Sequence, residues 1–136
     1  MAQMTPGARF RAALEANRPL PILGTINAYT ALMAEKVGHQ AIYLSGGGVA
    51  NASFGLPDLG MTSLDNVLED VRRITAVTEV PLLVDIDTGW DDMGQTVREM
   101  IAAGAAAVLQ PLPPVARLGA RARGARHCQR ERDGAA

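Results

Sequence analysis

Two carboxylates at the end of one apolar segment are the clearest chemical signal in the sequence. Asp85 and Asp87 close the run 80–87, which is otherwise almost continuously apolar. Residues two apart on a strand point to the same face, so both side chains are predicted to lie together where the strand meets a loop. Adjacent carboxylates repel each other unless a cation or a shared proton intervenes. Mg2+, which takes oxygen ligands and retains waters, would relieve the repulsion. Alternatively, one aspartate caps a helix and the other pairs with an arginine.

A glycine-rich segment, Ser45–Gly48, follows another short apolar run. Glycines let the backbone approach a ligand closely, and the exposed N–H groups can hold a carboxylate or a phosphate. The spacing matches neither the P-loop nor the dinucleotide fingerprint, and glycines also form ordinary turns between a strand and a helix. Anion binding and a plain turn therefore both stay open.

Tyr43 is either a core aromatic or a catalytic phenol, and Asp58 is either a turn residue or a ligand. Trp90 is either a packing anchor or a pocket wall.

Short apolar runs that alternate with helical patterns must position these residues. Strands are predicted at 21–25, 41–44, 80–87 and 105–109, with the first strand buried and the third buried on both faces. Helices are predicted at 6–16, 28–37 and 64–74, with a further one ending at Gly104, and Thr5 and Ser63 are the expected N-caps of the first and third. About three and a half strand–helix units indicate a parallel α/β sheet, either doubly wound or a (β/α)8 barrel. Functional residues of such a barrel gather at the carboxyl ends of the strands.

Composition and charge limit the class of protein. The chain has 136 residues, of which 48% are hydrophobic and 20% charged, as in an ordinary globular domain. A net charge of −1 gives no support for nucleic acid or an anionic membrane as a partner. The single cysteine, Cys128, excludes an internal disulfide and a multi-cysteine zinc site. The sequence has neither the pattern of a signal peptide nor that of a membrane span. A cytoplasmic location is therefore predicted.

The last 28 residues differ in composition from the rest. Residues 109–136 contain six basic and two acidic side chains, and Ala, Arg, Gly and Pro make up 18 of the 28 positions. A linker, a solvated basic tail and out-of-frame translation of GC-rich DNA would each produce this composition. We favour the third explanation, and we predict a boundary between an N-terminal unit at 1–108 and an unrelated tail at 109–136.

Five motifs in the first 108 residues together resemble the methylisocitrate lyase branch of the isocitrate lyase and phosphoenolpyruvate mutase superfamily. They occur in the order expected for that family: Pro6–Leu14, Gly24–Tyr29, Tyr43–Ala50, Gly55–Gly60 and Asp85–Trp90. The resemblance implies a (β/α)8 TIM barrel, of which this chain would hold the N-terminal half. It also implies a Mg2+-dependent lyase, usually homotetrameric, that cleaves the tricarboxylate (2R,3S)-2-methylisocitrate into pyruvate and succinate. That reaction belongs to the 2-methylcitrate cycle of propionate catabolism.

The resemblance also assigns roles to individual residues. Asp85 and Asp87, with Asp58 through a water molecule, would hold the Mg2+ ion. The pyruvate-side carboxylate of the substrate would be held by the residues that open the glycine-rich segment, namely Ser45, Gly46 and Gly47. The Tyr43 phenol would lie near the reacting hydroxyl.

The chain departs from the family pattern after residue 108. The family continues into a His-Ile-Glu-Asp-Gln segment and a Lys-Arg-Cys-Gly-His loop, whose cysteine is the expected proton donor. Here the segment Leu109–Pro114 follows, and Cys128 has the wrong neighbours for that role. The stretch Asp91–Met93 also replaces the usual glycine after Trp90. A complete barrel needs roughly 250 residues. We therefore expect the chain on its own to be poorly folded and inactive.

Two other functions stay open at this stage. The chain could derive from another enzyme of the superfamily, of the oxaloacetate decarboxylase or phosphonopyruvate type. It could instead be a non-catalytic half-barrel whose sheet edge is completed by a partner chain.

Overall fold

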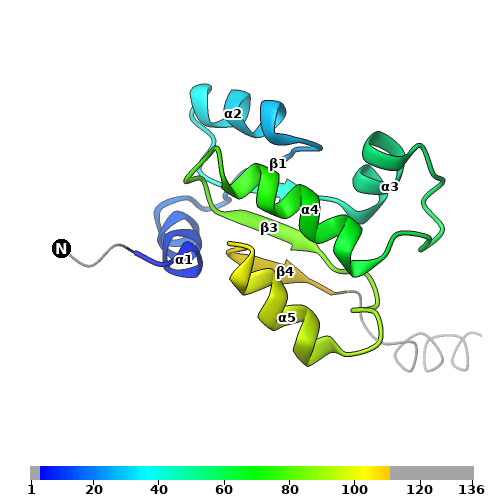
Figure 1. Ribbon diagram of the computed structural model, residues 1–136. Helices are drawn as coiled ribbons and strands as arrows, with labels where there is room; N and C mark the ends of the chain where they lie inside the picture. The colour runs from blue at the N-terminus through cyan, green and yellow to red at the C-terminus, as the bar shows by residue number, and fades with distance from the viewer. Residues whose placement is uncertain (1–3, 111–136) are drawn as a thin grey trace, which may run out of the picture.

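The computed structural model describes residues 4–110 (Figure 1). Residues 111–136 of the predicted tail, which include Cys128, lie outside the described part of the chain.

Within residues 4–110, four short parallel strands form one sheet. They are paired in sequence order, β1-β2-β3-β4, and their bounds are β1 Leu23–Gly24, β2 Ile42–Leu44, β3 Leu82–Asp85 and β4 Ala107–Leu109. The strand order never reverses, as in a barrel, whereas a doubly wound sheet has a reversal at its centre. The predicted parallel α/β architecture is confirmed, and of the two predicted arrangements the strand order favours the barrel.

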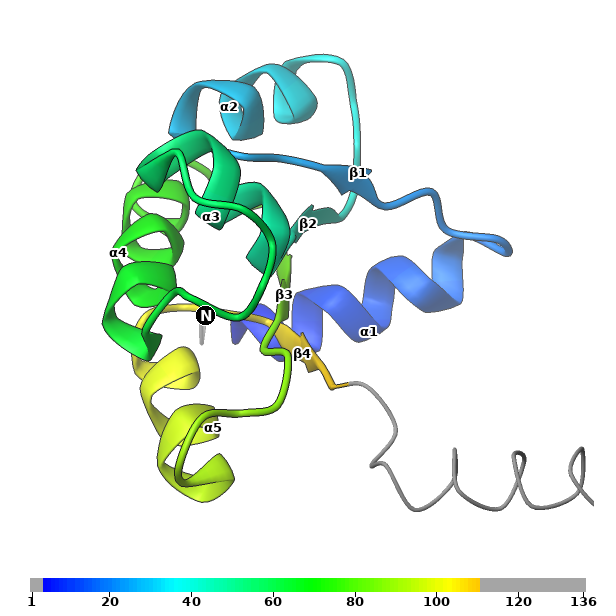
Figure 2. The same ribbon diagram turned by 90° about the vertical axis from the view of Figure 1, so that its right-hand side faces the viewer.

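Five helices in the described part of the chain pack around this sheet. Their bounds are α1 Pro6–Ala16, α2 Ala28–Lys36, α3 Gly46–Phe54, α4 Leu64–Thr75 and α5 Met93–Ala102. Helix α1 lies toward the amino ends of the strands, and α3 lies toward their carboxyl ends (Figure 1). Figure 2 looks along the strands and shows α4 and α5 on one side of the sheet and α1 on the other. The helices therefore leave the carboxyl ends of β2 and β3 next to α3 and the loops.

Side-chain caps explain where the helices begin. The Thr5 hydroxyl accepts a hydrogen bond from the N–H of Ala8, and the Ser63 hydroxyl accepts one from the N–H of Asn66, so both predicted caps are confirmed. Helix α3 was not predicted, because three consecutive glycines disfavour a helix. Ser45 caps its start, and Gly55, at φ +63°, ends it in the left-handed conformation that glycine adopts readily.

The core lies between the sheet and α2, α4 and α5. Its largest fully buried side chains in the strand regions are Ile42, Leu44, Leu82, Val84 and Ile86, which pack with Val67, Leu68, Val71, Ile74 and Met100 from the helices. The prediction of a fully buried first strand is wrong, because β1 is at the sheet edge and Leu23 is 40% exposed. The third strand is fully buried only at alternate positions, since Leu83 and Asp85 face the less covered side of the sheet.

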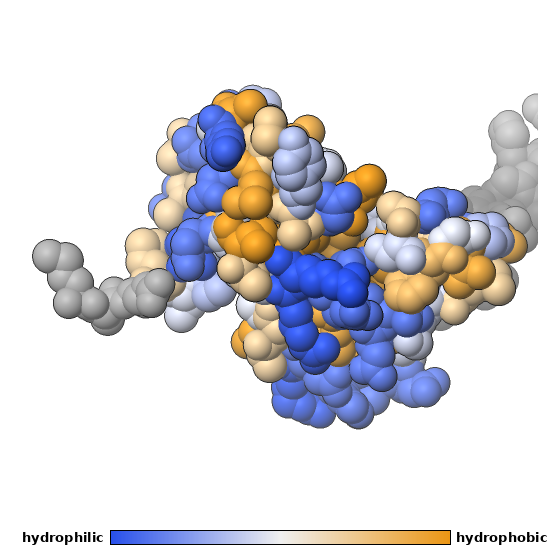
Figure 3. Space-filling view, turned by 45° about the horizontal axis from the view of Figure 1, so that its top comes forward, coloured by the Kyte–Doolittle hydropathy of each residue, from blue (hydrophilic) through white to orange (hydrophobic). Residues whose placement is uncertain are grey.

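Apolar side chains also reach the surface. Figure 3 shows them among strongly polar residues on one face of the molecule. Large exposed examples at or next to the outer strands are Leu23, Ile26 and Leu109. Parallel sheets are normally covered on both faces, so these positions mark where the half-barrel lacks cover among the described residues. Within residues 4–110, no helix has the length and apolar character needed to cross a membrane.

Candidate active site

The predicted site residues gather at the carboxyl ends of β2 and β3. Tyr43 lies within β2, and Asp85 is the last residue of β3. Gly46 and Gly47 are the first two residues of α3, directly after the cap Ser45. Parallel pairing of β2 with β3 brings these segments side by side, although they are about forty positions apart in the sequence.

Tyr43 and Asp85 form a direct hydrogen bond. The Tyr43 hydroxyl donates to Asp85 Oδ2 over 2.7 Å. Burial raises the pKa of the Tyr43 phenol to about 12, and the hydrogen bond to Asp85 and the Asp85 charge add to the rise. Tyr43 is therefore neutral at pH 7, and it can donate a proton in a hydrogen bond. The alternative that Tyr43 is purely a core aromatic is not supported, because its hydroxyl faces a carboxylate.

Asp87 also lies beside Asp85, but its backbone conformation differs from the predicted one. The alternation of a strand does not extend to it, because β3 ends at Asp85 and Asp87 has φ +45°, in the left-handed region. Its backbone N–H donates to Asp85 Oδ1 over 3.1 Å. The two aspartates are therefore neighbours through a tight loop rather than through a shared strand face. Non-glycine residues in this conformation are uncommon, and they cluster at functional sites.

The glycines of α3 form a cradle for two carboxylates. A Cβ atom on Gly46 would lie 2.7 Å from Asp87 Oδ2, and one on Gly47 would lie 2.5 Å from Asp58 Oδ2. Both distances are too short for a real side chain, so these positions accept only glycine while the carboxylates stay in place. Asp58, from the connection between α3 and α4, and Asp87, from the loop after β3, are thus brought against the same helix start.

The electrostatics of this cluster are unfavourable without a cation. The pKa of Asp87 is raised from its ordinary value, first by burial and then by the charges of Asp85 and Asp58. The negative charges of Asp85 and Asp58 therefore disfavour ionisation of Asp87, and a bound cation would relieve this repulsion. Among residues 4–110, the alternative in which one aspartate caps a helix and the other meets an arginine is not found. Asp92 caps α5, and the ion pairs among residues 4–110 involve Glu69, Asp70 and Glu79 instead.

This donor set fits a hydrated Mg2+ ion. In the described part of the chain, no group of three Asp, Glu, His or Cys side chains is arranged to hold one metal ion. Mg2+ does not need such a group, because it is usually bound by one or two carboxylates and keeps several waters. Direct ligation by Asp85 and Asp87, with Asp58 through a water molecule, stays a prediction.

The glycine-rich segment has one property that the sequence did not predict. The Ser45 hydroxyl accepts from the N–H of Gly48 over 3.3 Å, so Ser45 is a helix cap. The segment is therefore the first turn of α3 rather than an open loop. The N–H groups of a first helical turn have no partners within the helix and favour negative charge, so anion binding by Gly46 and Gly47 stays a prediction.

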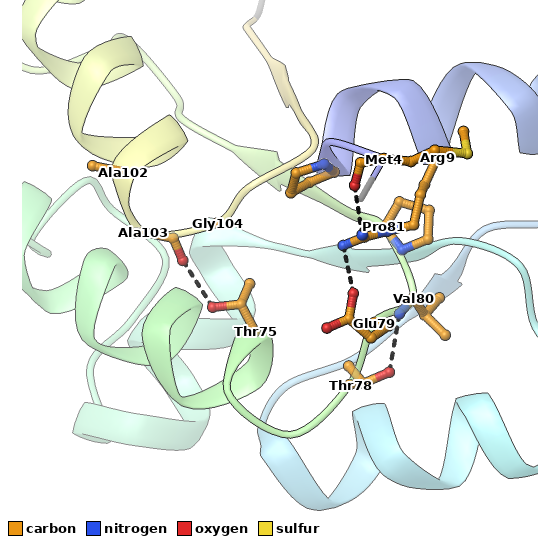
Figure 4. Close-up of a pocket in the computed structure, with 11 residues that line it drawn as sticks. Met4, Arg9, Thr75, Thr78, Glu79, Val80, Pro81, Ala102, Ala103 and Gly104 are labelled. Atoms are coloured by element: carbon orange, nitrogen blue, oxygen red, sulfur yellow. Dashed lines mark hydrogen bonds and ion pairs between the residues drawn. The ribbon is translucent and has the colours of Figure 1, made fainter. Parts of the chain in front are cut away.

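The site is distinct from the cavity at the opposite end of the sheet. That cavity, of about 360 Å³, lies between α1, the end of α4 and the segments that lead into β3 and β4. Figure 4 shows the Arg9–Glu79 ion pair and the hydrogen bond from Thr75 to the Ala103 carbonyl oxygen there. Residues at the amino ends of barrel strands contribute to stability rather than catalysis.

The family comparison agrees with the fold. The phosphoenolpyruvate phosphomutase family matches residues 10–109. The chain belongs to this family. Three 2-methylisocitrate lyases are among its similar relatives. The chain is 61% identical over 105 residues to that of Shewanella oneidensis, 59% over 108 to that of Vibrio cholerae and 57% over 110 to that of Escherichia coli. These matches cover 75%, 77% and 78% of the chain but only 36%, 35% and 37% of the relatives, respectively.

Solved structures of family enzymes have the same arrangement. A phosphonopyruvate hydrolase in complex with oxalate and Mg2+ is 31% identical, with a TM-score of 0.68, over 82% of this chain and 42% of that one. A 2,3-dimethylmalate lyase of the phosphoenolpyruvate mutase and isocitrate lyase superfamily is 26% identical, with a TM-score of 0.69, over 79% and 39%. The described half-barrel is therefore part of this family's fold, and the chain spans well under half of its relatives' length.

Proposed function

We propose that residues 1–108 are the metal-binding half of a methylisocitrate lyase, which cleaves (2R,3S)-2-methylisocitrate into pyruvate and succinate. The three aspartates that converge on the glycines of α3 carry this proposal, together with the identity of about 60% to three 2-methylisocitrate lyases. We further propose that the enzyme acts in the 2-methylcitrate cycle of propionate catabolism and that it is located in the cytoplasm. A homotetramer is the oligomer expected for the complete barrel.

The residues of this chain suit binding of an oxyacid. Mg2+, when bound by Asp85 and Asp87, stabilises negative charge on the oxygens of the substrate. The N–H groups of Gly46 and Gly47, at the start of α3, are free to hold a carboxylate of the substrate beside those aspartates. Tyr43, neutral at pH 7, donates a hydrogen bond at the same place. Together these groups position the hydroxyl and carboxylate oxygens of a 2-hydroxy acid.

The cleavage itself also needs an acid that protonates the product. A general base takes the proton of the substrate hydroxyl, the hydroxyl oxygen forms the new carbonyl of pyruvate, the carbon–carbon bond breaks, and its electron pair stays on the succinate carbon. That carbon then takes a proton from an acid. By the resemblance, the acid is a cysteine in a loop that follows the matched residues. Because the described strands and helices share one hydrophobic core, we propose, in place of a poorly folded chain, that this chain alone binds the substrate but does not turn it over.

A chimera tests the proposed function. Residues 1–108 of this chain replace the corresponding part of the Shewanella oneidensis relative, to which the chain is 61% identical. We expect Mg2+-dependent pyruvate release from methylisocitrate, and we expect Asp85→Asn in the same chimera to abolish it. A chimera that folds and instead cleaves phosphonopyruvate or decarboxylates oxaloacetate would assign the chain to another enzyme of the family. The 136-residue chain, assayed in parallel, is expected to give no pyruvate.

The origin of the tail is tested separately. We propose that residues 109–136 are an out-of-frame product. Sequencing of the coding DNA across codons 100 to 136 and beyond, with translation in all three forward frames, is expected to restore the missing His-Ile-Glu-Asp-Gln and Lys-Arg-Cys-Gly-His segments. If no frame restores them, the short chain is a product in its own right, and a partner chain for the half-barrel becomes the explanation to test.

A further inference from the structure

One hydrogen bond joins the two loops that carry Asp58 and Asp87. The indole N–H of Trp90 donates to the carbonyl oxygen of Thr62 over 2.9 Å. Thr62 follows Asp58 by four positions in the connection between α3 and α4, and Trp90 follows Asp87 by three positions in the loop before α5. The bond therefore connects two segments that each bring one carboxylate to the site.

The loop after β3 is held firmly at its Trp90 end. The Thr96 hydroxyl, in a side chain that is 1% exposed, donates to the Gly89 carbonyl oxygen over 2.8 Å. The Trp90 ring packs against the hydrophobic core. Trp90 has φ +54°, a conformation that costs a non-glycine residue energy and persists only where its surroundings enforce it. The indole is thus a fixed point of this loop.

The loop that carries Asp58 has little support of its own. Leu59 and Met61, on either side of Gly60, are 76% and 57% exposed. The backbone N–H groups of Leu56 and Leu59 donate only to nearby carbonyl oxygens, those of Ala50 and Pro57. Thr62, by contrast, is only 8% exposed. Its carbonyl oxygen is where the loop is tied to the rest of the described structure by Trp90.

We propose that Trp90 is a positioning residue that sets the Mg2+ affinity of the site by fixing the Asp58 loop relative to Asp87. This inference rests on the proposed function for the position of the ion. In this proposal Trp90 would not itself be a metal ligand. It acts through the Thr62 backbone on Asp58, in the manner of outer partners that orient metal ligands and whose loss typically costs 10–100-fold in metal affinity.

The test is Mg2+ binding by the 136-residue chain, measured by calorimetry. Trp90→Phe keeps an aromatic ring in the core and removes the N–H donor. Replacement of Trp90 by 3-benzothienylalanine removes the donor with almost no change of shape, and it serves if the Phe variant does not fold. The matched control is Thr75→Val. Thr75 also donates a side-chain hydrogen bond to a backbone carbonyl 28 residues away, that of Ala103, but at the opposite end of the sheet.

We expect both Trp90 variants to bind Mg2+ at least tenfold more weakly than the unmodified chain, and Thr75→Val to bind it equally well. Amide hydrogen exchange without metal should be faster in residues 56–62 of the Trp90 variants only. Asp85→Asn should abolish Mg2+ binding. That result would exclude the acidic surface around Asp65 and Glu99 as the place where the ion binds.

Three kinds of result overturn the inference in different ways. If the unmodified chain binds Mg2+ and the 3-benzothienylalanine variant binds it equally well, Trp90 has no positioning role and the proposed function stands. If the unmodified chain binds no Mg2+, or if Asp85→Asn leaves the binding intact, the metal site itself is wrong and the role of Trp90 fails with it. Loss of affinity in Thr75→Val equal to that in the Trp90 variants would show a general effect of stability.

Discussion

Gly47→Ala should separate the stability of α3 from the function of the site. Gly47 is the second residue of that helix, and alanine is a better helix former than glycine by up to about 1 kcal/mol. A methyl group at this position would lie 2.5 Å from Asp58 Oδ2, whereas ordinary contact begins at 3.4 Å. The Asp58 carboxylate must therefore retreat by about 0.9 Å.

The expected effects on stability and on binding have opposite signs. Asp58 is exposed, so its carboxylate can swing away without breaking the core, and the free energy of unfolding should rise or change by less than about 1 kcal/mol. The same movement takes Asp58 out of reach of a water bound to the ion. A displaced ligand of this kind should weaken Mg2+ binding on the order of tenfold, which corresponds to about 1.4 kcal/mol.

The assay pairs urea denaturation with calorimetric titration of Mg2+ into the 136-residue chain. Gly48→Ala is the matched control, because it lies in the same helical turn and its new methyl group would meet a side-chain carbon of Ile26 at 3.3 Å rather than a carboxylate. Gly48→Ala should keep the Mg2+ affinity. Equal affinities of Gly47→Ala and the unmodified chain would refute the cradle as the feature that holds Asp58 at the site.

Further predictions concern the charges and caps. The raised pKa of Asp87 means that the folded chain binds a proton there more readily than the unfolded chain does, so this group lowers stability as pH rises through its folded pKa. Asp87→Asn should therefore raise the midpoint of thermal unfolding at pH 7 without Mg2+, the gain should vanish below about pH 4, and added Mg2+ should no longer stabilise the variant. Tyr43→Phe leaves Asp85 Oδ2 without its donor and should cost about 1–3 kcal/mol in urea denaturation at pH 7. Ser63→Ala removes the cap of α4 and should cost about 1 kcal/mol, with no change in Mg2+ affinity if the cap acts on the helix alone.

Much of the fold could be predicted because its signals are local. The cap at Ser63 and the apolar spacing from Leu64 to Ile74 define α4 in any context, and the structure has that helix at Leu64–Thr75. The order of strands and helices follows from the same kind of signal. The edge position of β1 could not be read in this way, because exposure of Leu23 depends on which strands lie beside it. Burial at an edge is a property of the sheet, not of the segment.

The structure brings the predicted site residues together, but the sequence did not predict how they are arranged. Spacing alone placed Asp85 and Asp87 together, for the wrong reason, since the left-handed conformation of Asp87 has no signal in the sequence. The approach of Asp58 to Gly47 depends on α3, and three glycines in a row concealed that helix. The contact between Trp90 and Thr62 spans 28 positions and involves a backbone oxygen, so no residue pattern reports it.

Under the proposed function, binding and turnover should be separable in this chain, because the groups expected for each lie in different parts of the barrel. Tyr43, the three aspartates and the glycines of α3 all fall between residues 43 and 87, within two neighbouring strands and the segments that follow them. Their mutual contacts need no further strand. The proton donor expected from the resemblance lies beyond the matched residues. The 136-residue chain should therefore bind oxalate only in the presence of Mg2+ and release no pyruvate from methylisocitrate. Mg2+-independent oxalate binding would show that the aspartates do not organise this half of the site.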